Sequence, residues 1–336
     1  MPRPVGPWML ALFGALLLTL SGGCAGAAQP AAFWGDPPGP TASSGPSASA
    51  SPSPSASPSP SPSASRPASK GPVPPPAPRT GKPGRTNTGV VPGTVLTVVN
   101  GDQTFATSGA VITGKDFHGF VRVTGSNITF RNCIFRGGVP RGNGALLDTE
   151  RGTNTVVQDS EFVPAHPAAT IDGIWAKRTS IYRANIHGGV DGMKAGSGVL
   201  VQDSYIHDMS WFASDPNQGG GSTHNDGVQA FSGDSGITLR HNTIDMSTTH
   251  DPNAALQDSA RDVHVESNWL DGGGCTLNFA HDGGPLGSLH VTNNRFGRHS
   301  AFQCPIIVST QTTLTTNSGN VWDDTGGPIP PPQRHD

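Results

Sequence analysis

The sequence predicts an all-β protein: a single-stranded right-handed parallel β-helix (a solenoid) of about eight coils, preceded by a signal peptide and a disordered Pro/Ser-rich linker. A repeat of 26 or 27 residues, strand-like alternation inside each copy and a low content of charged residues lead to this prediction. The 336 residues divide into a signal peptide at 1–23, a linker at 24–92, the β-helix at 93–326 and a disordered tail at 327–336.

The repeat alternates apolar and polar residues over one short strand, turns at a polar Asn, Asp or Ser corner, and closes on a large apolar residue. The corner residues Asn132, Asn242, Asn268 and Asn294 are expected to form a structural ladder. Its copies occupy residues 127–135, 154–162, 198–206, 236–244, 262–270 and 288–296, with a shortened copy at 179–187. A unit of this length cannot bury its apolar face alone but can do so by stacking on further copies. Helical solenoids need a 3.6-residue period and propeller blades need about 40 residues, so the repeat favours a β-helix.

One coil is longer than the others, because the closing residues Ile206 and Ile244 are 38 positions apart. The extra residues, Ser210 to His224, form a Gly-rich loop with an aromatic pair at its base. Insertions in solenoids project from one face and often shape a binding surface. A neutral excursion of the chain is the alternative.

The cysteines of the β-helix region predict one disulfide. Cys275 and Cys304 occupy similar positions one coil apart. Stacked strands lie about 4.8 Å apart, which suits a disulfide in an oxidising exterior. Cys133 is then a free, buried thiol.

The first residues predict export. Arg3 precedes an apolar run from Trp8 to Leu20, which is too short to remain as a membrane span and suits a signal peptide. The segment that ends in Cys24 resembles a bacterial lipobox, and we expect lipidation of Cys24 and anchoring to the outer face of the cell membrane. Cleavage after Ala27, which would release a secreted protein, is the alternative.

The linker and the charge content set further limits. Residues 37–92 are rich in Pro and Ser and cannot bury enough apolar surface to fold, so they form an extended spacer. Charged residues make up 13% of the chain and the net charge is −3, which argues against binding nucleic acid. Membrane contact is expected only through the lipid on Cys24.

An Asp-Gly motif recurs at 171–175, 190–194 and 225–229, in successive coils. Equal positions stack in a solenoid, so two columns of side chains are expected on one face. The columns are Asp172, Asp191 and Asp226 in one, and Trp175, Lys194 and Gln229 in the other. An aromatic ring, a cation and an amide in a row are typical of a saccharide-binding surface, with His224 and Asn225 at its rim.

The coil repeat resembles the pectate-lyase-like superfamily of right-handed β-helices over residues 95–325. The resemblance implies a polysaccharide partner and, in the lyase branch, β-elimination on an acidic glycan. In that case Lys194, with a lowered pKa, is the catalytic base beside Asp191 and Asp226. Ca²⁺ is held by Asp172, Asp191 and Asp226. Sugar is positioned by Trp175, His224, Asn225 and Gln229.

Three alternatives stay open, because the sequence lacks the Trp-x-Asp-His and Arg-x-Pro-x-x-Arg motifs of pectate lyases. An inverting glycoside hydrolase would use two of the three Asp residues, one coil skipped between them. A glycan-binding or wall-associated surface protein would use none as a catalyst. The Asp-Gly column is otherwise only the way in which each coil turns its corner, since Asp can hydrogen-bond the local backbone and Gly can take the positive φ of a tight turn.

Overall fold

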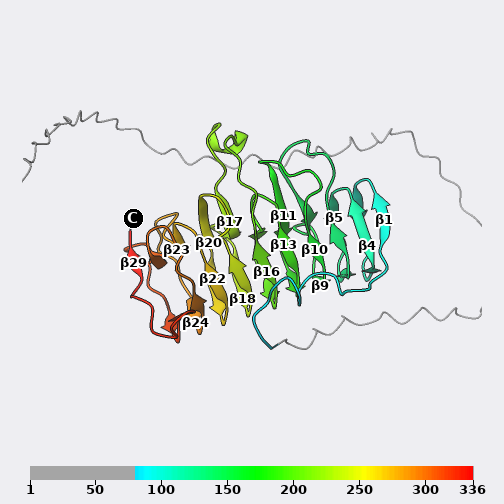
Figure 1. Cartoon of the computed structure of the whole chain (residues 1–336). Helices are drawn as coiled ribbons and strands as arrows, with labels where there is room; N and C mark the ends of the chain where they lie inside the picture. Colours follow the sequence, from blue (N-terminus) through cyan, green and yellow to red (C-terminus); the bar gives the residue numbers. More distant parts are fainter. Residues whose placement is uncertain (1–79, 336) are drawn as a thin grey trace, which may run out of the picture. The chain divides into compact units, whose positions relative to one another are not determined.

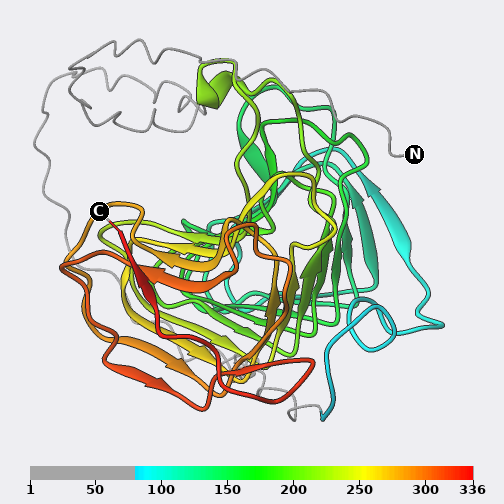
Figure 2. The same cartoon turned by 60° about the vertical axis from the view of Figure 1, so that its left-hand side comes forward.

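The structure is a computed structural model that describes residues 80–335. They form a parallel β-helix with three sheets, A, B and C, seen from the side in Figure 1 and turned in Figure 2. The predicted signal peptide, Cys24 and the linker up to residue 79 lie outside the described residues. No helix within residues 80–335 is long and apolar enough to cross a membrane.

Sheet A holds ten parallel strands whose inward residues stack in register. Phe117 and Phe135 stack at 5.3 Å between ring centres, and Phe135 and Phe162 stack at 4.6 Å. The strands are β1 (Thr97–Asn100), β4 (Lys115–His118), β7 (Ile134–Phe135), β10 (Glu161–Phe162), β13 (Asn185–His187), β16 (Tyr205–His207), β19 (Thr243–Asp245), β22 (Trp269–Asp271), β25 (Arg295–Phe296) and β28 (Val321–Trp322).

Sheet B also has ten strands and carries the Asp-Gly motifs. Its strands are β2 (Gln103–Phe105), β5 (Val121–Val123), β8 (Gly144–Asp148), β11 (Ile171–Ala176), β14 (Met193–Ala195), β17 (Asn225–Ala230), β20 (Pro252–Asp258), β23 (Cys275–Phe279), β26 (Cys304–Val308) and β29 (Gln333–Arg334). The structure joins Cys275 of β23 to Cys304 of β26 in a disulfide with 4.6 Å between the Cα atoms, and Cys133 is free and buried.

Sheet C has nine strands: β3 (Val111–Thr113), β6 (Thr129–Arg131), β9 (Thr155–Gln158), β12 (Thr179–Tyr182), β15 (Leu200–Gln202), β18 (Ser235–Arg240), β21 (Arg261–Glu266), β24 (Leu289–Thr292) and β27 (Thr316–Ser318). One 3-10 turn, η1 (Pro216–Gln218), lies in the insertion.

Each coil takes one strand from sheet A, one from B and one from C, in that order. Sheets of ten, ten and nine strands therefore make nine complete coils, numbered 1 to 9 here, and a two-strand coil 10. The sequence predicted about eight coils. Coil 1, which contains no copy of the repeat, and the incomplete coil 10 account for the difference.

A ladder of buried side chains follows the corner between sheets C and A. Asn268 accepts hydrogen bonds at Oδ1 from the backbone and side-chain N–H groups of Asn242, and donates through Nδ2 to the Leu239 carbonyl. Asn294 repeats this pattern one coil later. The expectation that Asn132 belongs to this ladder is wrong. Asn132 has a φ of 49° and lies one position earlier, where Cys133 occupies the ladder column.

The predicted linker and tail boundaries both need correction. The backbone before β1 packs along sheet A, so residues 80–92 are not part of a disordered linker. Residues 82–91, called the strap here, run from near β16 toward β1 in Figure 1. At the other end, β29 pairs with β26 and Pro328 bridges to Val321, so the tail is ordered up to residue 335.

The strap is fastened to coils far apart in the solenoid. Pro83 accepts a hydrogen bond from Thr243 of β19 at 2.8 Å, and Arg85 pairs with Asp208, which follows β16. Gly89 donates its N–H to the Arg183 carbonyl at 2.8 Å. A Cβ at Gly89 would lie 3.1 Å from the Asn185 Cβ, and the residue has a φ of 76°, so glycine allows the strap to lie close to sheet A.

Candidate functional site

The three Asp residues of the repeated motif form one column on sheet B. Strand register pairs Trp175 with Lys194 and Lys194 with Gln229, which places Asp172, Asp191 and Asp226 in successive coils. Each carboxylate binds the next coil: Asp172 Oδ1 accepts from the Asp191 N–H at 3.2 Å, and Asp191 Oδ1 accepts from the Asp226 N–H at 2.9 Å. The column is therefore part of the connection between coils.

Close packing of neighbouring coils explains why each motif contains glycine. A Cβ on Gly173 would lie 2.4 Å from the Gly192 carbonyl oxygen, and a Cβ on Gly192 would lie 2.4 Å from the Gly227 carbonyl oxygen. Neighbouring backbones approach too closely for any side chain at this point. Both glycines have ordinary negative-φ or extended backbone, so the proposal of a positive-φ turn is wrong.

The second column is half-buried and forms the accessible part of the site. Lys194 Nζ lies 3.0 Å from Asp172 Oδ2 and 5.5 Å from the centre of the Trp175 ring. Trp175 Nε1 donates to the same Asp172 oxygen at 2.7 Å. Asp172 thus fixes both the indole and the ammonium, and Gln229 continues the row on β17.

Lys194 is held as a cation, which opposes the predicted role of a base. Burial alone would lower its pKa, but the charges of Asp172, Asp191 and Asp226 outweigh burial and raise the pKa of Lys194 above its ordinary value. A general base must give up its proton near the working pH. The lowered pKa expected for Lys194 is therefore wrong.

The buried carboxyls hold their protons more tightly than ordinary Asp side chains. Burial, and then the charge of Asp172, raises the pKa of Asp191 to about 8. Burial, and then the charge of Asp191, raises the pKa of Asp226 well above its ordinary value. Asp172, Asp191 and Asp226 are 4%, 4% and 1% exposed, so a ligand on sheet B contacts them little unless neighbouring groups move.

The donor set of this column does not fit Ca²⁺. Ca²⁺ takes six to eight oxygen ligands at about 2.3–2.6 Å. Here the Asp172 oxygens already accept from N–H donors and from Lys194, and both Asp226 oxygens accept from Asn253 Nδ2 at 3.0 and 3.2 Å. A cation would have to displace these donors, Lys194 included. Within residues 80–335 no group of three His, Cys, Asp or Glu side chains has metal-binding geometry.

The insertion, residues 210–224, folds back over the N-terminal ends of the sheet B strands and stands above β17 in Figure 1. Asn225 is 0% exposed and donates to the Val190 and Ser210 carbonyls, so it anchors the loop and is unavailable to sugar. His224 is exposed at the return of the loop. Of the two predicted rim residues, only His224 can meet a ligand.

The loop reaches back across two coils. Asn217, in η1, exchanges two hydrogen bonds at 2.8 and 3.0 Å with Asn143, which precedes β8 in coil 3. Buried Asp215 caps η1 by accepting from the Asn217 N–H at 2.8 Å. The insertion therefore forms an arch beside coils 4 and 5, which carry Asp172 and Asp191.

Sequence reasoning missed Asn253 and Gln257, which extend the site into coil 7. Asn253 lies 27 residues after Asp226, one repeat length, and binds its carboxylate. Gln257 pairs in register with Gln229 and accepts from Asn253 Nδ2. Counting one more period from Asp226 could have found Asn253. The motif itself was hidden, because the strand register places Ala254 and Ala255 of coil 7 opposite Asp226 and Gly227 of coil 6.

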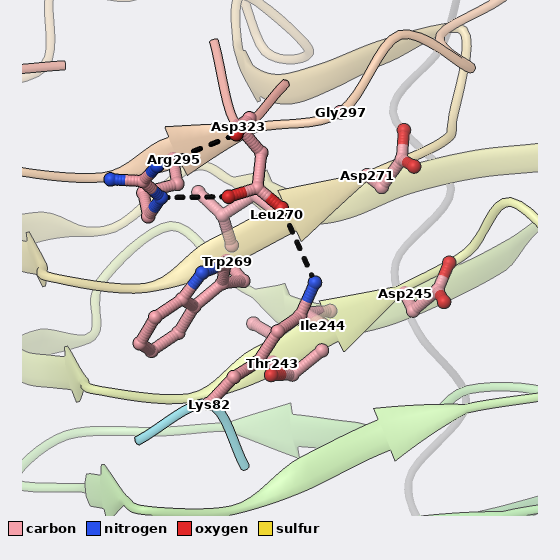
Figure 3. A pocket seen from close by; sticks show the side chains of 10 residues that line it. All are labelled: Lys82, Thr243, Ile244, Asp245, Trp269, Leu270, Asp271, Arg295, Gly297 and Asp323. Carbon is pink, nitrogen blue, oxygen red and sulfur yellow. Dashed lines mark hydrogen bonds and ion pairs between the residues drawn. The ribbon is translucent and has the colours of Figure 1, made fainter. Parts of the chain in front are cut away.

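A separate hollow lies on the outer face of sheet A, away from the Asp column (Figure 3). Lys82 of the strap points into it and pairs with Asp323 at 3.4 Å, while Arg295 holds the same carboxylate at 2.7 Å. Trp269, Asp245 and Asp271 complete the lining. The ion pairs of this hollow fasten the start of the strap to the last coils.

Comparison with known proteins gives no match: no protein-family model, no curated protein and no solved structure matches the chain. A parallel β-helix is compatible with a carbohydrate-active or surface protein. What the site does must be inferred from its own residues.

Proposed function

We propose that the protein is a surface-tethered, carbohydrate-active β-helix whose sheet B face binds an acidic polysaccharide. One observation carries the proposal: Trp175 and Lys194 stand side by side on neighbouring coils, and Asp172 holds both in place. An indole offers a flat apolar face to a sugar ring, and an ammonium attracts a uronate carboxylate. Half-buried Gln229 adds an amide along the same row, while Gln257 of coil 7 is 4% exposed and bonded to Asn253.

Affinity for polysaccharides of different charge tests this proposal. The exported chain, carrying Cys24→Ser to prevent lipidation, is titrated calorimetrically with uronate and neutral polysaccharides. Trp175→Ala and Lys194→Met are each expected to weaken uronate binding about tenfold, which corresponds to about 1.4 kcal/mol. Binding should also weaken with added salt, because a charge pair is screened.

Lys177→Met is the matched control. Its side chain is 33% exposed and pairs with Asp234 at 3.0 Å, while that of Lys194 is 30% exposed and pairs with Asp172 at the same distance. Loss of binding in Lys177→Met equal to that in Lys194→Met would refute the site. Absence of binding to every uronate polysaccharide would refute the proposed function.

Inverting hydrolysis is a second candidate, favoured by the different states of Asp172 and Asp226. Asp226 keeps its proton and can act as an acid, whereas Asp172 is ion-paired to Lys194 and can act as the base for water. They lie two coils apart, a separation of about 9–10 Å in the backbone, near the upper end of the range for inversion.

Hydrolysis would release reducing ends, and the Asp226→Asn variant should no longer release them. A β-elimination lyase would instead produce an unsaturated product that absorbs at about 235 nm, and a binding protein would give neither product.

A further inference from the structure

The N-terminal end of the β-helix is an open surface, separate from the sheet B site. Strands β1, β2 and β3 of coil 1 stand last in their sheets, and no strand within residues 80–335 pairs with their outer edges. Backbone N–H and C=O groups along such an edge can accept another strand.

The core is also half open at this end. Val99, Phe105 and Ile112 pack on the core from coil 1 but are only half-buried. Their register partners one coil later are Phe117, Val123 and Phe130, which are 1%, 0% and 0% exposed. On the outer faces of coil 1, Val98 and Val111 are 54% and 53% exposed. Exposed valines on β1 and β3 thus flank an apolar interior.

Coil 1 lacks the charges that commonly protect a sheet edge. Between residues 93 and 114 the only charged residue is Asp102. Its Oδ1 accepts from the Phe120 N–H of coil 2 at 2.9 Å, so this charge is directed toward the solenoid. Exposed edges of monomeric proteins usually carry Lys, Pro or bulges that prevent pairing.

The described chain indicates what can cover this end. The opposite end differs: Pro328 bridges to Val321 of β28, Ile329 packs on the core, and residues 330–332 are all Pro, which cannot donate to a strand ladder. That end is therefore a poor partner for coil 1 of another copy. The strap begins beside coils 6 and 7, far from coil 1, and the sequence before residue 80 is rich in Pro, which cannot donate to a strand ladder.

We propose that the N-terminal ends of two copies meet head to head, forming a symmetric dimer. A two-fold axis perpendicular to the solenoid axis reverses the direction of the facing strands, so the edges of coil 1 pair antiparallel. The contact would bury Val98, Val99, Phe105, Val111 and Ile112 of both copies. The dimer buries the N-terminal ends of both copies and leaves no such end for a third copy, so association stops at two copies.

Sedimentation equilibrium tests the dimer with the exported chain carrying Cys24→Ser, at about 1 to about 100 μM, a range in which a micromolar interface is populated. The wild type is expected to reach twice the monomer mass. Val98→Lys with Val111→Lys is expected to remain monomeric, because like charges would meet across the two-fold axis. Thr104→Lys, at an exposed position of β2, tests the same edge through a second, milder variant.

Val139→Lys is the matched control, since Val139 is 67% exposed and lies outside coil 1. It is expected to dimerise like the wild type, and circular dichroism checks that every variant is folded. A monomeric wild type at the highest concentration would overturn the proposal. So would assembly beyond a dimer, or a monomeric Val139→Lys variant.

Discussion

Asp258 lies at the end of β20, in register with the core residue Ala230, and is 0% exposed. Its Oδ1 accepts from the Ala260 N–H at 3.2 Å, and its Oδ2 has no hydrogen-bond partner among the described residues. Burial raises the pKa of Asp258 to about 7. The side chain is therefore a neutral acid inside an apolar core up to about that pH.

Asp258→Asn should change how stability depends on pH. The unfolded carboxyl loses its proton near pH 3.8 and the folded one near pH 7. Between these values the folded state binds more protons, so the contribution of Asp258 to the free energy of unfolding falls as pH rises, by up to about 4 kcal/mol. Urea unfolding at about pH 4 and about pH 7 measures this as the difference between wild type and Asp258→Asn.

Asp262→Asn provides the comparison, because the Asp262 side chain is 56% exposed and its φ of 56° suits Asn. The difference in the free energy of unfolding between Asp262→Asn and the wild type should stay nearly constant over the same pH range. An equally constant difference for Asp258→Asn would show that Asp258 is ionised in the folded protein.

At the scale of the element, the Asn ladder is the feature on which the C–A corner depends. Asn268→Ala would leave the backbone N–H of Asn242 and the Leu239 carbonyl without partners. A buried unsatisfied polar group costs about 1–3 kcal/mol, so we expect a loss of about 2–5 kcal/mol in the free energy of unfolding. Asn100→Ala, at an exposed position of β1, should change stability by less than about 0.5 kcal/mol. Equal effects in urea unfolding would contradict a structural role for the ladder.

The Asp column and the Asn ladder also show how much of the structure can be predicted from the sequence. Stacking of Asp172, Asp191 and Asp226 could be predicted, because a solenoid converts equal spacing into adjacency. Asn132 was misplaced because two neighbouring corner positions both accept Asn. Counting from the closing apolar residue separates them: Asn268 lies two positions before Leu270, and Asn132 lies three before Phe135.

The state of Lys194 and the path of the strap could not be predicted in the same way. The pKa of Lys194 depends on how far burial and three carboxyls oppose each other, which residue spacing does not specify. The strap lies outside the repeat and binds through single contacts to coils distant in sequence. A periodic pattern in the sequence therefore does not predict such contacts.

At the scale of the whole molecule, the strap covers His207, which is 0% exposed. Arg85 of the strap lies 3.3 Å from its Nδ1, Asn185 Oδ1 lies 3.0 Å from its Nε2, and Asp208 lies beside it. The His207 ring also stacks on Tyr205 and His187. Burial lowers the pKa of His207 to about 4, although Asp208 opposes this effect.

His207→Gln should therefore reduce sensitivity to acid. The unfolded imidazole gains a proton near pH 6.5 and the folded one only near pH 4, so the stability contributed by neutral His207 is lost as pH falls between these values. The loss is up to about 3 kcal/mol, opposite in direction to that of Asp258. Urea unfolding should show that the wild type loses this stability and His207→Gln does not.

His281→Gln is the control, because that side chain is 50% exposed. The free energy of unfolding of His281→Gln should change with pH in the same way as that of the wild type. Acid sensitivity that persists in His207→Gln would show that His207 is not the responsible group. In the wild type the opposing contributions of Asp258 and His207 partly cancel, which should give a flatter pH profile than either variant shows.

The strap also determines how the β-helix responds to mechanical tension. A force applied through the chain at residue 80 acts first on the contacts of Lys82, Pro83 and Arg85, and only later on Gly89 and Val91. These contacts lie in series along the chain, so we expect them to break one after another as the strap peels from the solenoid. Ten released residues add about 30 Å of extension before the load reaches β1. The strap is thus a built-in extensible element that protects coil 1 from being unravelled by a pull on the chain before it.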